Sequence, residues 1–197
     1  MGWAGTAGSL NALVRDKTPN ELAKINQDQL LGMGVPDPLV QAFMSNTCYD
    51  PWEQTLLVGE LASMRGVKDC KVFIETATAA NEESVAVFLR VRAQLMGRYH
   101  DKTKSVERFV DAGGVPLLQT KNGTIVGIFP FDHVAWTVRT LLKEKAISTA
   151  LQKMEGVRGR ELLIMGAVEP HARKVFEDRG WRVGDRIEQR FLKKPGP

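Results

Sequence analysis

Apolar residues in the first half of the chain recur three and four positions apart, the spacing that gives an α-helix one buried face. Several of these stripes begin at clear start signals. Thr18-Pro19-Asn20-Glu21 combines a capping hydroxyl, a proline at the first helical position and a glutamate at the third, and Asp50-Pro51-Trp52-Glu53 repeats this arrangement. We therefore predict a small helical bundle with helices near 18–32, from 37, over 50–66, over 69–80 and over 82–100.

The pattern changes after Asp111-Ala112-Gly113-Gly114. Residues 117–120 and 124–129 flank an Asn122-Gly123 pair, which is typical of a hairpin, and we expect a type I′ turn there. The second arm is apolar at successive positions. Both of its faces should therefore be covered by other parts of the fold.

The last third predicts a helix over about 133–154, capped by Asp132, and then a strand–helix–strand unit. Its strands are expected at 162–165 and 181–183, and its helix begins at Glu169-Pro170. Residues 186–191 could extend the sheet. The order β-β-α-β-α-β behind a run of helices indicates an α+β fold, with a helical domain over 1–112 and a small mixed-sheet domain over 113–197.

Charge is divided unevenly between these two parts. Of the 197 residues, 43% are hydrophobic and 25% charged, which excludes wholesale disorder. Residues 1–112 carry 12 basic against 14 acidic residues, whereas residues 113–197 carry 15 against 9. Such an excess fits either a solvated basic surface or attraction to nucleic acid. The candidate nucleic-acid contacts are Arg179, Trp181, Arg182, Arg186 and Arg190.

Cysteine and hydropathy patterns exclude further classes of protein. Cys48 and Cys70 have no metal-ligand spacing, so we expect neither zinc nor another metal; two free thiols and one disulfide both stay open. No stretch reaches 18 apolar residues, so we expect no membrane span. The first ten residues lack the pattern of a signal peptide. We expect a cytoplasmic location, or export if the chain is a fragment of a longer precursor.

Catalytic signatures are sparse. The three histidines are His100, His133 and His171, and none has the spacing of a metal site. Asp132 and His133 are adjacent, but neighbours on a helix do not face each other, so a cap beside an exposed histidine explains both. No G-x-S-x-G elbow occurs. A site assembled between the two halves from these histidines and Asp132 is the enzyme hypothesis.

One segment has the context of a phosphate site. After the strand predicted at 162–165, a glycine turn leads into a helix N-terminus, whose free N–H groups attract anions. The candidate anion-binding residues are Gly166, His171, Arg173 and Lys174. Glu169 and Pro170 oppose this interpretation, because one adds negative charge and the other removes a donor.

These patterns favour a non-catalytic binding or structural interaction module, within either a larger or an exported assembly. We expect no cofactor and a protein partner. The first alternative is a nucleic-acid-binding protein that uses its basic half, and the second is a small enzyme with a site between the halves.

Overall fold

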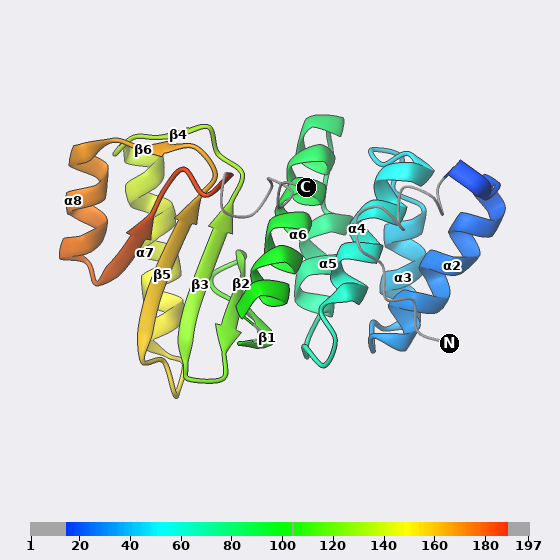
Figure 1. The fold of residues 1–197 in the computed structure, drawn as a ribbon, viewed down its shortest axis with the longest axis horizontal. Helices are drawn as coiled ribbons and strands as arrows, with labels where there is room; N and C mark the ends of the chain where they lie inside the picture. Colours follow the sequence, from blue (N-terminus) through cyan, green and yellow to red (C-terminus); the bar gives the residue numbers. More distant parts are fainter. Residues whose placement is uncertain (1–14, 104, 189–197) are drawn as a thin grey trace, which may run out of the picture. The chain divides into compact units, whose positions relative to one another are not determined.

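The computed structural model describes residues 15–103 and 105–188 (Figure 1). The chain divides into two compact units, Met1–Asp101 and Lys102–Pro197. The boundary predicted at residue 112 therefore lies beyond the division that the structure makes. Among the described residues, no helix combines the length and apolar character needed to cross a membrane.

The N-terminal unit is helical. Its helices are α2 (Pro19–Gly32), α3 (Asp37–Met44), α4 (Pro51–Ser63), α5 (Lys71–Thr78) and α6 (Glu83–Thr103). The Thr18 hydroxyl accepts a hydrogen bond from the Glu21 N–H, and the Glu21 carboxylate accepts from the Thr18 N–H, so the predicted capping box is formed. The Asp50 carboxylate caps α4 by accepting from the Glu53 N–H at 2.7 Å.

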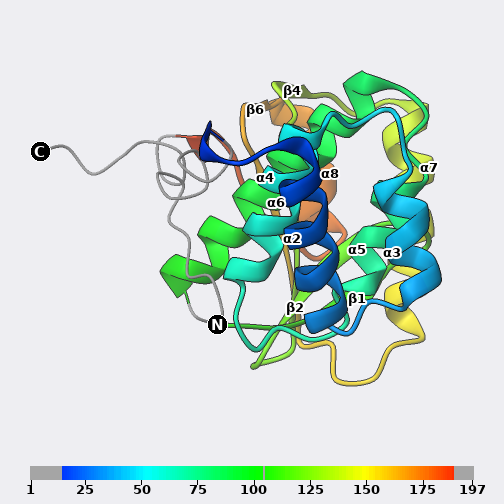
Figure 2. The same cartoon turned by 90° about the vertical axis from the view of Figure 1, so that its right-hand side faces the viewer.

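Packing in this unit follows the apolar stripes. α2 contacts α3 and α4, and α3 contacts α5 (Figure 1, Figure 2). Leu30, Phe43 and Phe73 are fully buried. A polar pair lies within the same core, where the Asn26 amide donates to the Thr55 hydroxyl at 3.0 Å. The helical bundle thus follows from local sequence signals, which are the helix caps and the apolar stripes.

The C-terminal unit is built on a five-stranded sheet of order β1-β2-β3-β5-β7. The first three strands are antiparallel, and β3, β5 and β7 run parallel. Two short strands, β4 and β6, form a separate parallel pair. The elements are β1 (Val106–Asp111), β2 (Pro116–Thr120), β3 (Thr124–Phe129), β4 (His133–Val134), α7 (Val138–Gln152), β5 (Gly159–Ile164), β6 (Ala167–Val168), α8 (Pro170–Asp178) and β7 (Trp181–Gly184).

One core of this unit lies between the sheet and its helices. Leu151 of α7 and Phe176 of α8 pack with Ile125, Leu162 and Ile164 from the strands. β3 is buried at four successive positions and lies between β2 and β5 in the sheet, as its apolar pattern indicated. The α+β prediction is confirmed, with helices first and a mixed sheet behind them.

Four local features of the structure differ from the predictions. β1 was not predicted, because its Glu107 and Arg108 interrupt the apolar pattern. The hairpin turn is not type I′: Gly123 has φ +84°, but Asn122 has no positive φ, and the Gly123 N–H donates to the Thr120 carbonyl. That geometry is a type I turn followed by a left-handed glycine, the usual three-residue connection.

The helix predicted from 133 begins five residues later. Thr137 caps α7 by accepting from the Thr140 N–H, and residues 133–134 form β4 instead. The Asp132 carbonyl accepts a hydrogen bond from the Ala167 N–H, which ties it to β6 rather than to a helix. Tertiary pairing with a strand more than 30 residues away therefore displaces the helix start.

The chain leaves the sheet at Gly184, before the predicted extension over 186–191. Arg186 adopts a left-handed φ of 52° and donates its N–H to the Gly166 carbonyl, which is incompatible with a continued strand. Residues 189–191 lie outside the described residues. Cys48 and Cys70 are free thiols, so the disulfide alternative does not hold in this structure.

Candidate anion-binding pocket

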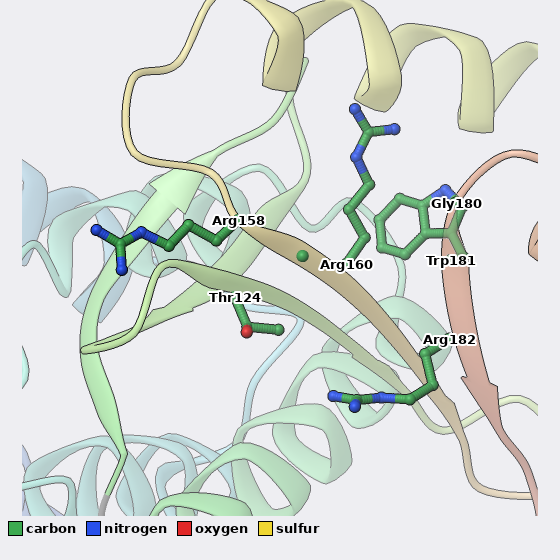
Figure 3. A pocket seen from close by; sticks show the side chains of 7 residues that line it. Thr124, Arg158, Arg160, Gly180, Trp181 and Arg182 are labelled. Atoms are coloured by element: carbon green, nitrogen blue, oxygen red, sulfur yellow. The ribbon is translucent and has the colours of Figure 1, made fainter.

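The three parallel strands β3, β5 and β7 begin at one edge of the sheet, and a pocket of about 390 Å³ lies at that edge. We call it the arginine pocket, because arginine is its most frequent lining residue (Figure 3). The lining consists of Thr124, Arg158, Gly159, Arg160, Gly180, Trp181 and Arg182. All seven belong to the C-terminal unit.

The hairpin turn positions one wall of the arginine pocket. The Gly123 carbonyl accepts a hydrogen bond from the Arg158 N–H at 2.9 Å, which holds the α7–β5 connection against the turn. A Cβ on Gly123 would lie 2.3 Å from the Gly156 carbonyl oxygen. Only glycine permits this approach and the positive φ, so the Asn-Gly pair serves the pocket as well as the hairpin.

Arg160 is held by neighbours on the helical side of the sheet. Its guanidinium donates to the Ser148 hydroxyl of α7 at 3.0 Å and lies 5.9 Å from the centroid of the Trp181 ring. Ser148 in turn donates to the Glu144 carboxylate at 2.5 Å. Because the Ser148 hydroxyl is itself held by Glu144, it orients the Arg160 guanidinium more firmly than a water molecule would.

Glu144 is the buried carboxylate behind this wall, with 3% of its surface exposed. It also accepts hydrogen bonds from Arg179 at 2.8 Å and from the Trp181 indole N–H at 3.2 Å. Arg179 therefore compensates the buried negative charge, as a buried carboxylate requires. The charge of Arg160 is left without a carboxylate partner among the described residues.

The other two arginines reach solvent. Arg182 has a side chain that is 74% exposed and lies 3.5 Å from a Glu161 carboxylate oxygen, a weak pair because water screens it. Arg158 is exposed, and within 15–103 and 105–188 its guanidinium has no hydrogen bond or ion pair. The arginine pocket therefore presents cationic donors that the fold leaves largely uncompensated.

The structure divides the residues predicted to contact nucleic acid. Trp181 and Arg182 line the arginine pocket, and Arg179 lies directly behind it on Glu144. Arg186 follows the other end of β7, at the opposite edge of the sheet. Arg190 lies outside the described residues.

The predicted anion-binding residues lie at that opposite edge. Arg173 donates to the Val183 carbonyl at 2.8 Å and pairs with Asp185 at 2.9 Å, so its guanidinium already has partners within the fold. His171 and Lys174 are exposed on α8. Gly166 gives its N–H to the Phe131 carbonyl at 2.8 Å. An anion-binding role for these four residues stays a prediction.

Asp185 joins three elements at this edge, because it follows β7, accepts a hydrogen bond from Val168 of β6 and pairs with Arg173 of α8. Burial alone raises the pKa of its carboxyl, but hydrogen bonds from the Val168 N–H and from Arg173, with the charges of Arg173 and Arg186, outweigh burial and lower the pKa below its ordinary value. Its role is to anchor β7 to β6 and α8.

The histidines are spread over both units. His133 on β4 and His171 on α8 are exposed, whereas His100 is buried on α6 with 8% exposure. Asp132 is exposed. No group of three metal-ligating side chains occurs in the part of the chain that the structure describes.

Sequence reasoning did not single out Arg158 and Arg160. A signal was nevertheless present, because Arg158 and Arg160 stand shortly before the strand predicted at 162–165, and Arg182 lies in the strand predicted at 181–183. The starts of parallel strands lie at one edge of a sheet, so basic residues at these positions come together.

The chain matches no family model, no curated protein and no solved structure to which it was compared.

Proposed function

We propose that this protein is a non-catalytic binding module whose C-terminal unit holds a phosphate-bearing ligand in the arginine pocket. The observation that carries the proposal is that Arg158, Arg160 and Arg182 all line one pocket at the edge where the parallel strands begin. Guanidinium groups present planar pairs of N–H donors that match phosphate oxygens.

The chemistry of the lining supports binding rather than catalysis. Arginine keeps its proton throughout the physiological range, so it orients and neutralises an anion but does not shuttle protons. The remaining polar side chains of the lining are the Thr124 hydroxyl and the Trp181 indole, and the indole N–H is already used by Glu144. None of the three histidines belongs to the lining.

The proposal is tested by calorimetric titration of the full chain with inorganic pyrophosphate at low ionic strength. We expect binding that Arg158→Gln weakens at least fivefold, because one charge-assisted contact is lost. Arg139→Gln is the matched control, since Arg139 is exposed on the first turn of α7 and lies outside the lining.

Equal weakening by the two variants would show that only net charge matters and would contradict the proposal. Absence of pyrophosphate binding by the unmodified protein would contradict it as well.

A further inference from the structure

We infer that the arginine pocket takes the phosphodiester backbone of a single-stranded nucleic acid, an inference that rests on the proposed function. The three arginines of the pocket point in different directions. Arg160 pairs across the sheet with Trp181, and Glu161 pairs with Arg182. Since successive residues of a strand face opposite sides, Arg160 and Arg182 leave the sheet on opposite faces.

Figure 3 shows the same divergence. The Arg160 side chain rises toward α7, Arg182 lies on the other side of the strands, and Arg158 extends away from both. A single phosphate cannot contact three guanidinium groups that point apart. A chain of linked phosphates that crosses the strand edge can give one phosphate to each.

The basic surface continues beyond the lining along the same edge. Lys121 in the hairpin turn and Lys153 after α7 are exposed and belong to connections that lead into β3 and β5. Exposed Glu155 lies in the same α7–β5 connection as Lys153, and the opposite edge of the sheet carries both signs, with Arg173 paired to Asp185. Lys121 and Lys153 extend the cationic surface past the pocket lining, which fits a polyanion longer than the pocket itself.

Trp181 decides what kind of contact such a strand makes. Its side chain is 5% exposed, its N–H is bonded to Glu144, and Arg160 lies over its ring. It therefore offers no open ring face for a base to stack on, unlike the aromatic platforms of many single-strand binders. Recognition rests on the backbone, so binding is independent of base sequence and sensitive to salt.

The test measures binding of the full chain to fluorescent oligothymidine and oligoadenosine by anisotropy, from 20 to 200 mM salt. Three phosphate contacts predict a slope of about −2 in log affinity against log salt for a single strand, equal for both sequences. Arg158→Gln and Arg182→Gln should each reduce the steepness by about 0.7. Arg139→Gln should leave the slope unchanged, and all three positions are exposed, so folding is preserved.

Each outcome is decisive. Pyrophosphate binding at the arginine pocket without oligonucleotide binding would overturn this inference and leave the proposed function standing. Absence of both would overturn both. Tighter binding to a duplex, or to inorganic polyphosphate of equal charge, would overturn the assignment to a single strand. A slope that the two pocket variants do not change would place the oligonucleotide elsewhere on the protein and overturn it too.

Discussion

At the scale of single residues, Glu144 organises the arginine pocket from behind. Its carboxylate accepts hydrogen bonds directly from Ser148, Arg179 and Trp181. Arg160 is linked to it indirectly, because its guanidinium donates to the Ser148 hydroxyl. Each of the three donors would lose a charge-assisted partner if this carboxylate were removed.

Replacement of this carboxylate is therefore predicted to lower stability. Glu144→Gln keeps the shape of the side chain but removes the charge that compensates Arg179, and we expect a loss of about 2 kcal/mol in the free energy of unfolding. Urea unfolding followed by circular dichroism measures it. Glu155→Gln, an exposed position just after α7, is the matched control and should change stability by less than about 0.5 kcal/mol. A neutral effect of Glu144→Gln would refute the role given to this residue.

At the scale of elements, Gly166 in the β5–β6 turn comes closer to another backbone segment than the other described glycines of the C-terminal unit. A Cβ on Gly166 would lie 1.9 Å from the Asp132 carbonyl oxygen, and that oxygen accepts the hydrogen bond from Ala167 that begins the β4–β6 pairing. Backbone atoms of two paired segments occupy the space, so neither can move aside as a flexible side chain would.

Gly166→Ala is accordingly predicted to destabilise the protein by about 3 kcal/mol, because overpacking forces the β4–β6 pairing apart. The comparison is Gly159→Ala in β5, where the nearest atom to an added Cβ is the Thr124 hydroxyl at an ordinary 3.6 Å. Thermal unfolding of the two variants should separate them by many degrees. Equal midpoints would show that the turn relaxes freely and that the close approach has no structural importance.

At the scale of the whole molecule, the N-terminal unit contains a buried acid that couples stability to pH. Burial raises the pKa of Glu60 on α4 to about 7, although the charges of Arg98 and Arg90 act in the opposite direction. The carboxylate lies close to Gly97 of α6, where an added Cβ would be 2.9 Å from one of its oxygens. A raised pKa means that folding favours the protonated form.

The sign of the pH dependence follows from that preference. The stabilisation is fully present below the ordinary pKa of 4.5 and is lost as pH rises through about 7, a change of about 3 kcal/mol at most. Glu60→Gln mimics the protonated acid, so the variant should match the unmodified protein near pH 4.5 and exceed it at pH 8. Thermal unfolding from pH 4.5 to 8 measures this, with exposed Glu75→Gln as control. If Glu60→Gln kept the full slope, another group would be responsible.

Much of the fold could be predicted from the sequence because its signals act over a few residues. Thr18 and Glu21 meet within one turn of helix, Asp50 caps the helix that begins at Pro51, and Asn122-Gly123 closes a hairpin between adjacent strands. Their consequences need no distant partner, and the apolar stripes then assign each helix its buried face.

What the sequence by itself determined is thus the order of the helices and of four strands of the main sheet, the α+β class and the basic character of the C-terminal half. Only the tertiary structure decided where the basic residues meet. Thr124, Arg160 and Arg182 are far apart in the chain, and α7 and α8 separate the strands that carry them. Pairing of those strands in parallel brings their first residues to one edge, whereas the same pairing leaves Arg186 at the other. Parallel pairing of strands that are separated by a whole helix is a long-range property, because it depends on how the crossover connection packs on the sheet.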